Sequence, residues 1–174
     1  RYGDQPVEQR LAVVARNLIS LRARVRRWRF KASGFRLVAR GLSGVYEDMR
    51  DAERLARRHP TAANFHEWRK QVKYHTAQLS FLREAAPDIL GAYGAVGSKL
   101  GDVLGEHHDL DVLLAALAGD PAAGSEHVRV LAGAVRIRMS ELQDQAFRLG
   151  DELGAERLAA FRDRIRRNWR AWRA

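Results

Sequence analysis

Apolar side chains recur at intervals of three and four residues along nearly the whole chain, which is the spacing of one helical face. No sustained alternating stretch predicts a β-strand. Stretches containing Gly, Pro, Ser or Asn break the pattern at residues 31–35, 59–64 and 119–125, and Pro87 adds a further break. The pattern therefore predicts an all-α protein, an antiparallel bundle of six helices joined by short loops. Their expected ranges are about 6–30, 34–58, 61–86, 88–118, 124–150 and 154–172.

The third predicted helix carries a row of basic side chains at i, i+3, i+4 and i+7, which places them on one face. The members of this row are His66, Arg69, Lys70 and Lys73. Positively charged side chains this close repel one another unless an anion binds between them. A chain of phosphates could place one phosphate group beside each side chain of the row. A solvated basic face is the alternative, but such faces usually mix Glu with Lys, and only Glu67 lies beside this row. His75 falls on roughly the opposite face, so we interpret it as peripheral to the row.

The second predicted helix carries a similar row of arginines at i, i+4, i+7 and i+8. Its members are Arg50, Arg54, Arg57 and Arg58. Because the second and third helices are consecutive and antiparallel, we expect the two basic rows to face each other across a groove.

The fourth predicted helix has a stripe of glycines spaced three or four residues apart. The stripe consists of Gly91, Gly94, Gly97, Gly101 and Gly105. Each Gly inside a helix costs about 1 kcal/mol relative to Ala, so the stripe needs a compensating role. One interpretation is close helix packing, and the other is a channel floor where an extended ligand approaches the backbone. His108 lies on the same stripe, and Lys99 lies near its upstream end.

The same helix contains a cluster of ionisable residues, "EHHDLD", at 106–111. His107 and Asp111 lie at i,i+4 and could bind a divalent metal ion. Alternatively, Asp109 and Asp111 orient a histidine or pair with basic residues of a neighbouring helix. We favour this second interpretation and predict no metal site, because no other segment supplies an obvious pair of ligands.

Composition narrows the kinds of partner. The chain has 174 residues, of which 46% are hydrophobic and 30% charged, as expected for a globular protein. Its 31 Lys and Arg against 21 Asp and Glu give a net charge of +10, which favours a polyanionic partner. The absence of Cys excludes disulfides and thiolate metal sites. With no long apolar run and no signal-peptide pattern, we expect a cytoplasmic protein without a membrane partner. The first residue is not Met, so one interpretation is that the chain is a fragment of a longer one, which the sequence alone does not decide.

Two motifs resemble those of the CHAD family, the conserved-histidine α-helical domains. That family has His-x-x-Arg-Lys-x-x-Lys on one helix and Leu-Gly-x-x-His-Asp-Leu near the end of a later helix. "FHEWRKQVKYH" at 65–75 carries the first motif, "LGEHHDL" at 104–110 carries the second, and the likeness is strongest over residues 40–118. The resemblance implies two helical bundles related by an internal repeat. It also implies a groove whose His, Arg and Lys side chains bind inorganic polyphosphate without catalysis, and an association with polyphosphate granules.

The chain holds one copy of each motif, whereas a complete family member carries a related pair in its first half as well. We therefore interpret residues 1–58 as two helices that remain from the first bundle. Residues 59–174 are then a four-helix bundle that carries the motifs, and the helices after residue 121 resemble the C-terminal end of the family. We expect the first two helices either to repack on the second bundle or to form a homodimer with another copy.

These observations predict a polyphosphate-binding module that is not an enzyme and needs no cofactor. Its predicted site comprises both basic rows, Lys99 and His108, and sulfate or phosphate ions would occupy the same side chains in crystals. One alternative is a metal-dependent phosphohydrolase of the HD type, which His108 and Asp109 superficially resemble. Another is a nucleic-acid-binding domain, for which the basic stretch 162–173 is the best contact. We see no nucleic-acid motif and no set of stacking aromatics, so we regard nucleic acid as the less suitable partner.

Overall fold

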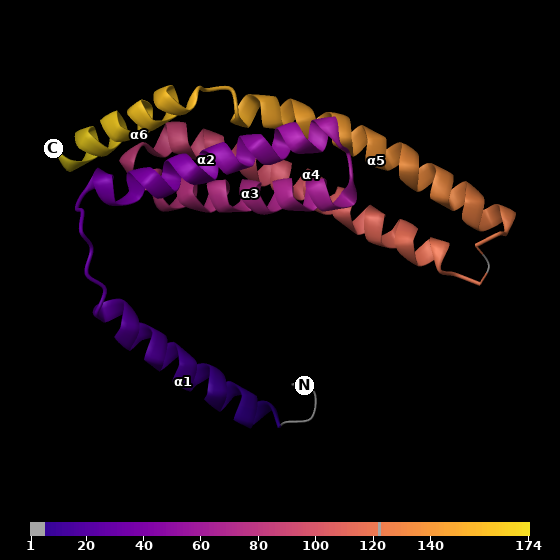
Figure 1. The fold of residues 1–174 in the computed structure, drawn as a ribbon, viewed down its shortest axis with the longest axis horizontal. Helices are drawn as coiled ribbons and strands as arrows, with labels where there is room; N and C mark the ends of the chain where they lie inside the picture. Colours follow the sequence, from indigo (N-terminus) through magenta and orange to yellow (C-terminus); the bar gives the residue numbers. More distant parts are fainter. Residues whose placement is uncertain (1–5, 122) are drawn as a thin grey trace. The chain divides into compact units, whose positions relative to one another are not determined.

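A computed structural model describes residues 6–121 and 123–174. This part of the chain is helical without any β-strand, which confirms the predicted all-α fold of six helices. None of the described helices is both long enough and apolar enough to cross a membrane. The helices are α1 (Val7–Arg26), α2 (Phe35–Arg58), α3 (Ala62–Phe81), α4 (Pro87–Ala118), α5 (Glu126–Leu153) and α6 (Leu158–Arg173), with a 3₁₀ turn at Arg83–Ala85 (Figure 1).

Local sequence signals set most helix ends close to the predicted positions. Thr61 and Ser125 cap α3 and α5, because each side-chain oxygen accepts a hydrogen bond from the backbone N–H three residues later, at 3.3 Å and 3.4 Å. Gly34 separates α1 from α2 and has a φ of 60°, a left-handed conformation that glycine adopts without strain. The end of α3 was predicted wrongly, because the helix stops at Phe81 and the chain continues as the 3₁₀ turn Arg83–Ala85.

Contacts divide the chain into two compact units, of which the first ends at Leu37 and the second begins at Val38. In the first unit, the apolar residues of α1 are spaced four and three apart along one stripe. They are Val7, Leu11, Val14, Leu18, Leu21 and Val25. No residue of α1 is buried, so its own unit does not cover this stripe. Whether the stripe repacks on the second unit or pairs with another copy stays a prediction.

Almost all of α2 belongs to the second unit. The ring of Tyr46 stacks on Phe161 of α6 with 4.2 Å between centroids, and its hydroxyl donates a hydrogen bond to the Glu156 carbonyl at 2.8 Å. The buried face of α2 comprises Leu42, Tyr46, Met49, Ala52, Glu53 and Ala56. The boundary between the compact units therefore lies in the first turn of α2, between Leu37 and Val38. The interpretation of residues 1–58 as a remnant of a first bundle stays a prediction.

The core of the second unit forms around one face of α3. Its buried residues follow a three-four spacing and are Phe65, Trp68, Val72, His75 and Leu79. Trp68 is fully buried and stacks on Phe147 of α5 with 5.5 Å between ring centroids. Because this face is occupied by the core, the row that begins at His66 is left on the side of α3 that borders α4 and solvent.

His75 lies inside this core, which agrees with its placement away from the basic row. Its ring is fully buried against both Tyr46 and Phe161, with centroids 5.3 Å and 5.5 Å away. Neither ring nitrogen has a hydrogen-bond partner among the described residues. Burial, together with the positive charge of Arg164, lowers the pKa of His75 from 6.5 to about 4.

We expect the free energy of unfolding to fall as the pH is lowered from 6.5 to 4. In the unfolded chain His75 binds a proton near pH 6.5, whereas in the folded protein it does so only near pH 4. Above pH 6.5 His75 is neutral in both states, and the fold keeps its full stability. Between pH 6.5 and 4 the unfolded chain gains a proton that the folded protein does not, so the free energy of unfolding falls by about 3 kcal/mol. Urea unfolding at several pH values measures this dependence. The variant His75→Leu removes the titrating group and should show a shallower slope, and an equal slope would contradict the assignment.

Candidate functional site

α3 and α4 approach closely because α4 presents glycine where the two helices meet. A Cβ at Gly97 would overlap the Oγ1 atom of Thr76, and a Cβ at Gly105 would lie 3.5 Å from Nη2 of Arg69. The hydroxyl of Thr76 also donates a 2.8 Å hydrogen bond to the Val72 carbonyl, which holds it against α4. Gly97 therefore supports the packing interpretation of the stripe, whereas a Cβ at Gly105 would make only an ordinary van der Waals contact.

A hollow of about 430 Å³ lies beside this contact, and we call it the α3–α4 hollow. Its lining residues are Arg69, Lys73, Thr76, Ala77 and Ser80 from α3, and Gly97, Ser98, Gly101 and Asp102 from α4. A Cβ at Gly101 would meet no heavy atom within 4 Å, so the absence of a side chain leaves the floor open. The two interpretations of the glycine stripe therefore apply to different glycines. Gly97 allows the close packing of α3 and α4, and Gly101 leaves the floor of the hollow open.

Arg69 and Lys73 supply positive charge to one wall of the α3–α4 hollow. Arg69 is half-buried, and its guanidinium lies beside Gly105, where an added Cβ would be in van der Waals contact with it. Its Nε atom is buried and has no hydrogen-bond partner among the described residues. Lys73 lies one turn further along and is exposed. Asp102 is the acidic residue of the lining, so the two cations outnumber it.

Two histidines extend this basic surface toward the N-terminal end of α3. The rings of His66 and His108 lie 5.3 Å apart between centroids and are inclined by 50°. His66 is exposed and His108 is half-buried, so an anion can reach both. The structure therefore brings together residues of both sequence motifs, although the motifs lie about forty residues apart along the chain.

Lys70 and Lys99 were predicted site residues, but neither lines the α3–α4 hollow. The Nζ atom of Lys70 lies 2.5 Å from the Glu67 carboxylate, which raises the pKa of Lys70. Lys99 is exposed and follows Gly97 by two residues, which places it about 200° around the helix from the hollow. A role for either lysine in binding stays a prediction.

Three of the four arginines of the α2 row line a different hollow of about 400 Å³, which we call the α2–α5 hollow, whereas Arg58 does not line it. Its lining residues are Arg50, Glu53, Arg54, Arg57, Gly150, Asp151, Gly154 and Ala155. The expected single groove between the two basic rows is therefore not formed. The physical reason is that α2 and α3 meet through core residues such as Tyr46 and His75, whose rings lie 5.3 Å apart.

Acidic neighbours already compensate much of the charge in the α2–α5 hollow. Arg57 lies 2.7 Å from the Glu53 carboxylate and 2.6 Å from that of Asp151, and it donates a hydrogen bond to the Phe147 carbonyl at 2.8 Å. Arg54 pairs with Asp51 on the same helix. Binding of a ligand by the α2 row stays a prediction, but these ion pairs make it a weaker candidate than Arg69 and Lys73.

The "EHHDLD" segment makes structural contacts with α5. His107 is buried, its Nε2 atom lies 3.0 Å from Nε2 of Gln143, and burial lowers its pKa. Glu106 pairs with Arg138 at 2.9 Å, so this residue, rather than Asp109 or Asp111, makes the ion pair with the neighbouring helix. Among the described residues, no group of three or more His, Asp or Glu side chains is placed to hold a metal ion.

Several polar residues of the α3–α4 hollow were missed in the sequence. Thr76 and Ser80 continue the three-four spacing of His66, Arg69 and Lys73 along α3, and this signal could have identified them. Ser98 and Asp102 follow Gly97 and Gly101 directly, but their position in the lining depends on how α4 is rotated against α3.

Comparison with known families agrees with these motifs. The family model of the CHAD domain matches residues 7–118. The chain belongs to the CHAD family. The match covers α1 to α4, begins earlier than the expected residue 40, and does not include α5 or α6. Comparison with curated proteins and with solved structures found no match. CHAD domains are linked in general to polyphosphate binding and are generally binding modules without catalytic activity.

Proposed function

We propose that this CHAD domain binds inorganic polyphosphate along the α3–α4 hollow, without catalysis. The observation that carries the proposal is the position of Arg69 and Lys73 on one wall above the open backbone at Gly101. An arginine fork and a lysine ammonium both bind phosphate oxygens through charge-assisted hydrogen bonds. The rings of His66 and His108 would add N–H donors on the side of Arg69 that is toward the N-terminal end of α3.

The arrangement suits an extended anion better than a compact one. From His66 to Ser80, α3 rises by about 20 Å, and donors occur along one side at nearly every turn. Phosphate oxygens are acceptors, whereas the Lys, Arg, Ser and Thr side chains of this surface can donate. Affinity would come from many such contacts and from the release of counterions, so it should increase with polymer length and fall with salt.

A titration with polyphosphates of defined length at two salt concentrations tests the proposal. We expect submicromolar binding to long chains, weaker binding to short ones, and a steep loss of affinity at the higher salt concentration. DNA of matched total charge should compete poorly, because the α3–α4 hollow offers no aromatic residue on which bases could stack. Equal competition by DNA, or release of phosphate from the polymer by a pure sample, would contradict the proposal.

Filling the floor of the α3–α4 hollow should weaken binding without weakening the fold. The variant Gly101→Leu adds a side chain where a Cβ meets nothing within 4 Å, so it should block the floor and reduce affinity about tenfold or more. It should also stabilise α4 by up to about 1 kcal/mol through helix propensity. Polyphosphate titration and urea unfolding measure the two effects.

Gly94→Leu is a matched control on the same helix. A Cβ at Gly94 also meets no heavy atom within 4 Å, but this residue does not line the α3–α4 hollow. It should raise stability by a similar amount and leave affinity unchanged. Equal losses of affinity in both variants would show that the floor at Gly101 is not part of the site.

A further inference from the structure

The α4–α5 hairpin extends beyond the helices that cover its base. α4 has 32 residues and α5 has 28, whereas α3 has 20, so α4 is longer than α3 by about 18 Å. Figure 1 shows the two long helices continuing side by side past the ends of α2 and α3. At the base, His107 of α4 packs against Phe65 of α3 with 4.4 Å between ring centroids. Beyond that point, no third helix of the second unit's described residues packs on the two helices of the hairpin.

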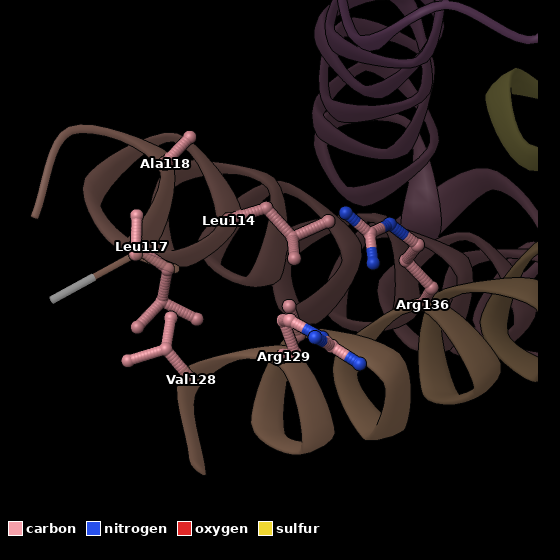
Figure 2. A pocket seen from close by; sticks show the side chains of 8 residues that line it. Leu114, Leu117, Ala118, Val128, Arg129 and Arg136 are labelled. Carbon is pink, nitrogen blue, oxygen red and sulfur yellow. The ribbon is translucent and has the colours of Figure 1, made fainter. Parts of the chain in front are cut away.

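This overhanging part exposes apolar side chains. Val112 is 54% exposed, Leu131 46% and Ile137 67%, and Leu113 and Val130 are exposed as well. A groove of about 370 Å³ runs between the two helices, and we call it the hairpin groove. Figure 2 shows Leu117 of α4 facing Val128 of α5 across this groove, with Leu114 of α4 on the side of Arg129. These three apolar side chains are half-buried, and the five exposed apolar residues lie on the hairpin outside the groove lining. Exposed apolar surface beside a groove is typical of a site of interaction with another protein.

Two arginines with a regular spacing line the rim of the hairpin groove. Arg129 and Arg136 are seven residues apart on α5, so they lie on one face about 10 Å from each other (Figure 2). Neither forms an ion pair or a side-chain hydrogen bond within the described part of the chain. Arg138, by contrast, pairs with Glu106 at 2.9 Å and with Glu141 at 3.0 Å. The groove therefore offers two uncompensated guanidinium groups beside an apolar floor.

These features fit an amphipathic helix better than they fit polyphosphate. A helix laid in a groove buries its apolar stripe, and carboxylates two turns apart on its edge would meet Arg129 and Arg136 in bidentate pairs. Polyphosphate needs donors along its whole length, whereas the other lining residues are Leu114, Leu117, Ala118, Ala123, Val128 and Ala132. We propose that the hairpin groove is a docking site for an acidic amphipathic helix of a partner protein.

A designed helical peptide can probe this surface directly. The probe carries Leu on one stripe and Glu at two positions seven residues apart, with a fluorescent label, and anisotropy reports its binding to the chain. We expect the double variant Arg129→Glu with Arg136→Glu to lose at least about tenfold in affinity for it. A second peptide with Lys in place of the two Glu residues should bind this variant and not the original chain.

The control reverses two other exposed arginines, Arg148→Glu and Arg162→Glu, which changes the net charge equally. It should leave affinity for the Glu peptide within about twofold, which is a change of less than about 0.5 kcal/mol in binding free energy. The proposal is overturned if the Glu peptide does not bind, or if the control loses as much affinity as the groove variant. It is also overturned if light scattering shows that the groove variant disrupts a homodimer, or if that variant loses polyphosphate affinity as strongly as it loses peptide affinity.

Discussion

Replacing Arg69 and Lys73 together with alanine should weaken polyphosphate binding by about 100-fold at low salt. Each hydrogen bond to a charged group contributes about 1.5–3 kcal/mol, and because both residues are solvent-accessible we take the lower end, so the loss of both contacts corresponds to about 3 kcal/mol. Both residues line the α3–α4 hollow, and neither makes an ion pair with another residue that the structure describes. Circular dichroism should therefore show unchanged helical content, while titration with long polyphosphate shows the loss.

The matched control removes the same charge elsewhere on α3 and α4, with Lys70→Ala and Lys99→Ala. These two lysines are exposed and lie outside the α3–α4 hollow, so we expect a loss of only about threefold from the weaker general attraction. If both double variants lost affinity equally, the ligand would respond to net charge rather than to this hollow. If Arg69→Ala with Lys73→Ala kept full affinity, the site would lie elsewhere.

The variant Gly150→Val should destabilise the second unit by about 3 kcal/mol. A Cβ at this position would lie 2.7 Å from Cζ2 of Trp68 and 2.9 Å from Oε1 of Glu53. Both side chains are held in place, because Trp68 is fully buried against Phe147 and Glu53 is paired with Arg57 at 2.7 Å. Urea unfolding should show a lower transition midpoint with an unchanged slope.

Gly133→Val is the matched control on the same helix. A Cβ at Gly133 meets no heavy atom within 4 Å, so the change removes a flexible residue without crowding and should alter stability by less than about 1 kcal/mol. Similar effects at both positions would mean that α5 can shift away from Trp68, in contradiction to the tight packing described above.

Much of the fold follows from local signals in the sequence. The apolar period and the breaks at Gly34, Thr61, Pro87 and Ser125 determine the helices, because each signal acts within one turn of its own position. Helical spacing alone also predicts that the row from His66 to Lys73 lies on a different face of α3 from Trp68 and His75.

The neighbours of each helix could not be predicted in this way, because they depend on how the helices are rotated against one another. Arg50 and Arg54 face the end of α5 rather than the α3 row, because the buried face of α2 meets α3 through Tyr46. The glycine stripe shows the same limit. Its spacing does not distinguish Gly97, which meets Thr76, from Gly101, which borders open space.

The position of bound polyphosphate can be measured directly in a crystal structure of the chain with a short polymer. Phosphate groups should lie over Gly101 within hydrogen-bond distance of Arg69 and Lys73, with the polymer continuing toward His66 and His108. Phosphates held instead by Arg50 and Arg54 in the α2–α5 hollow, with none in the α3–α4 hollow, would contradict the proposed site.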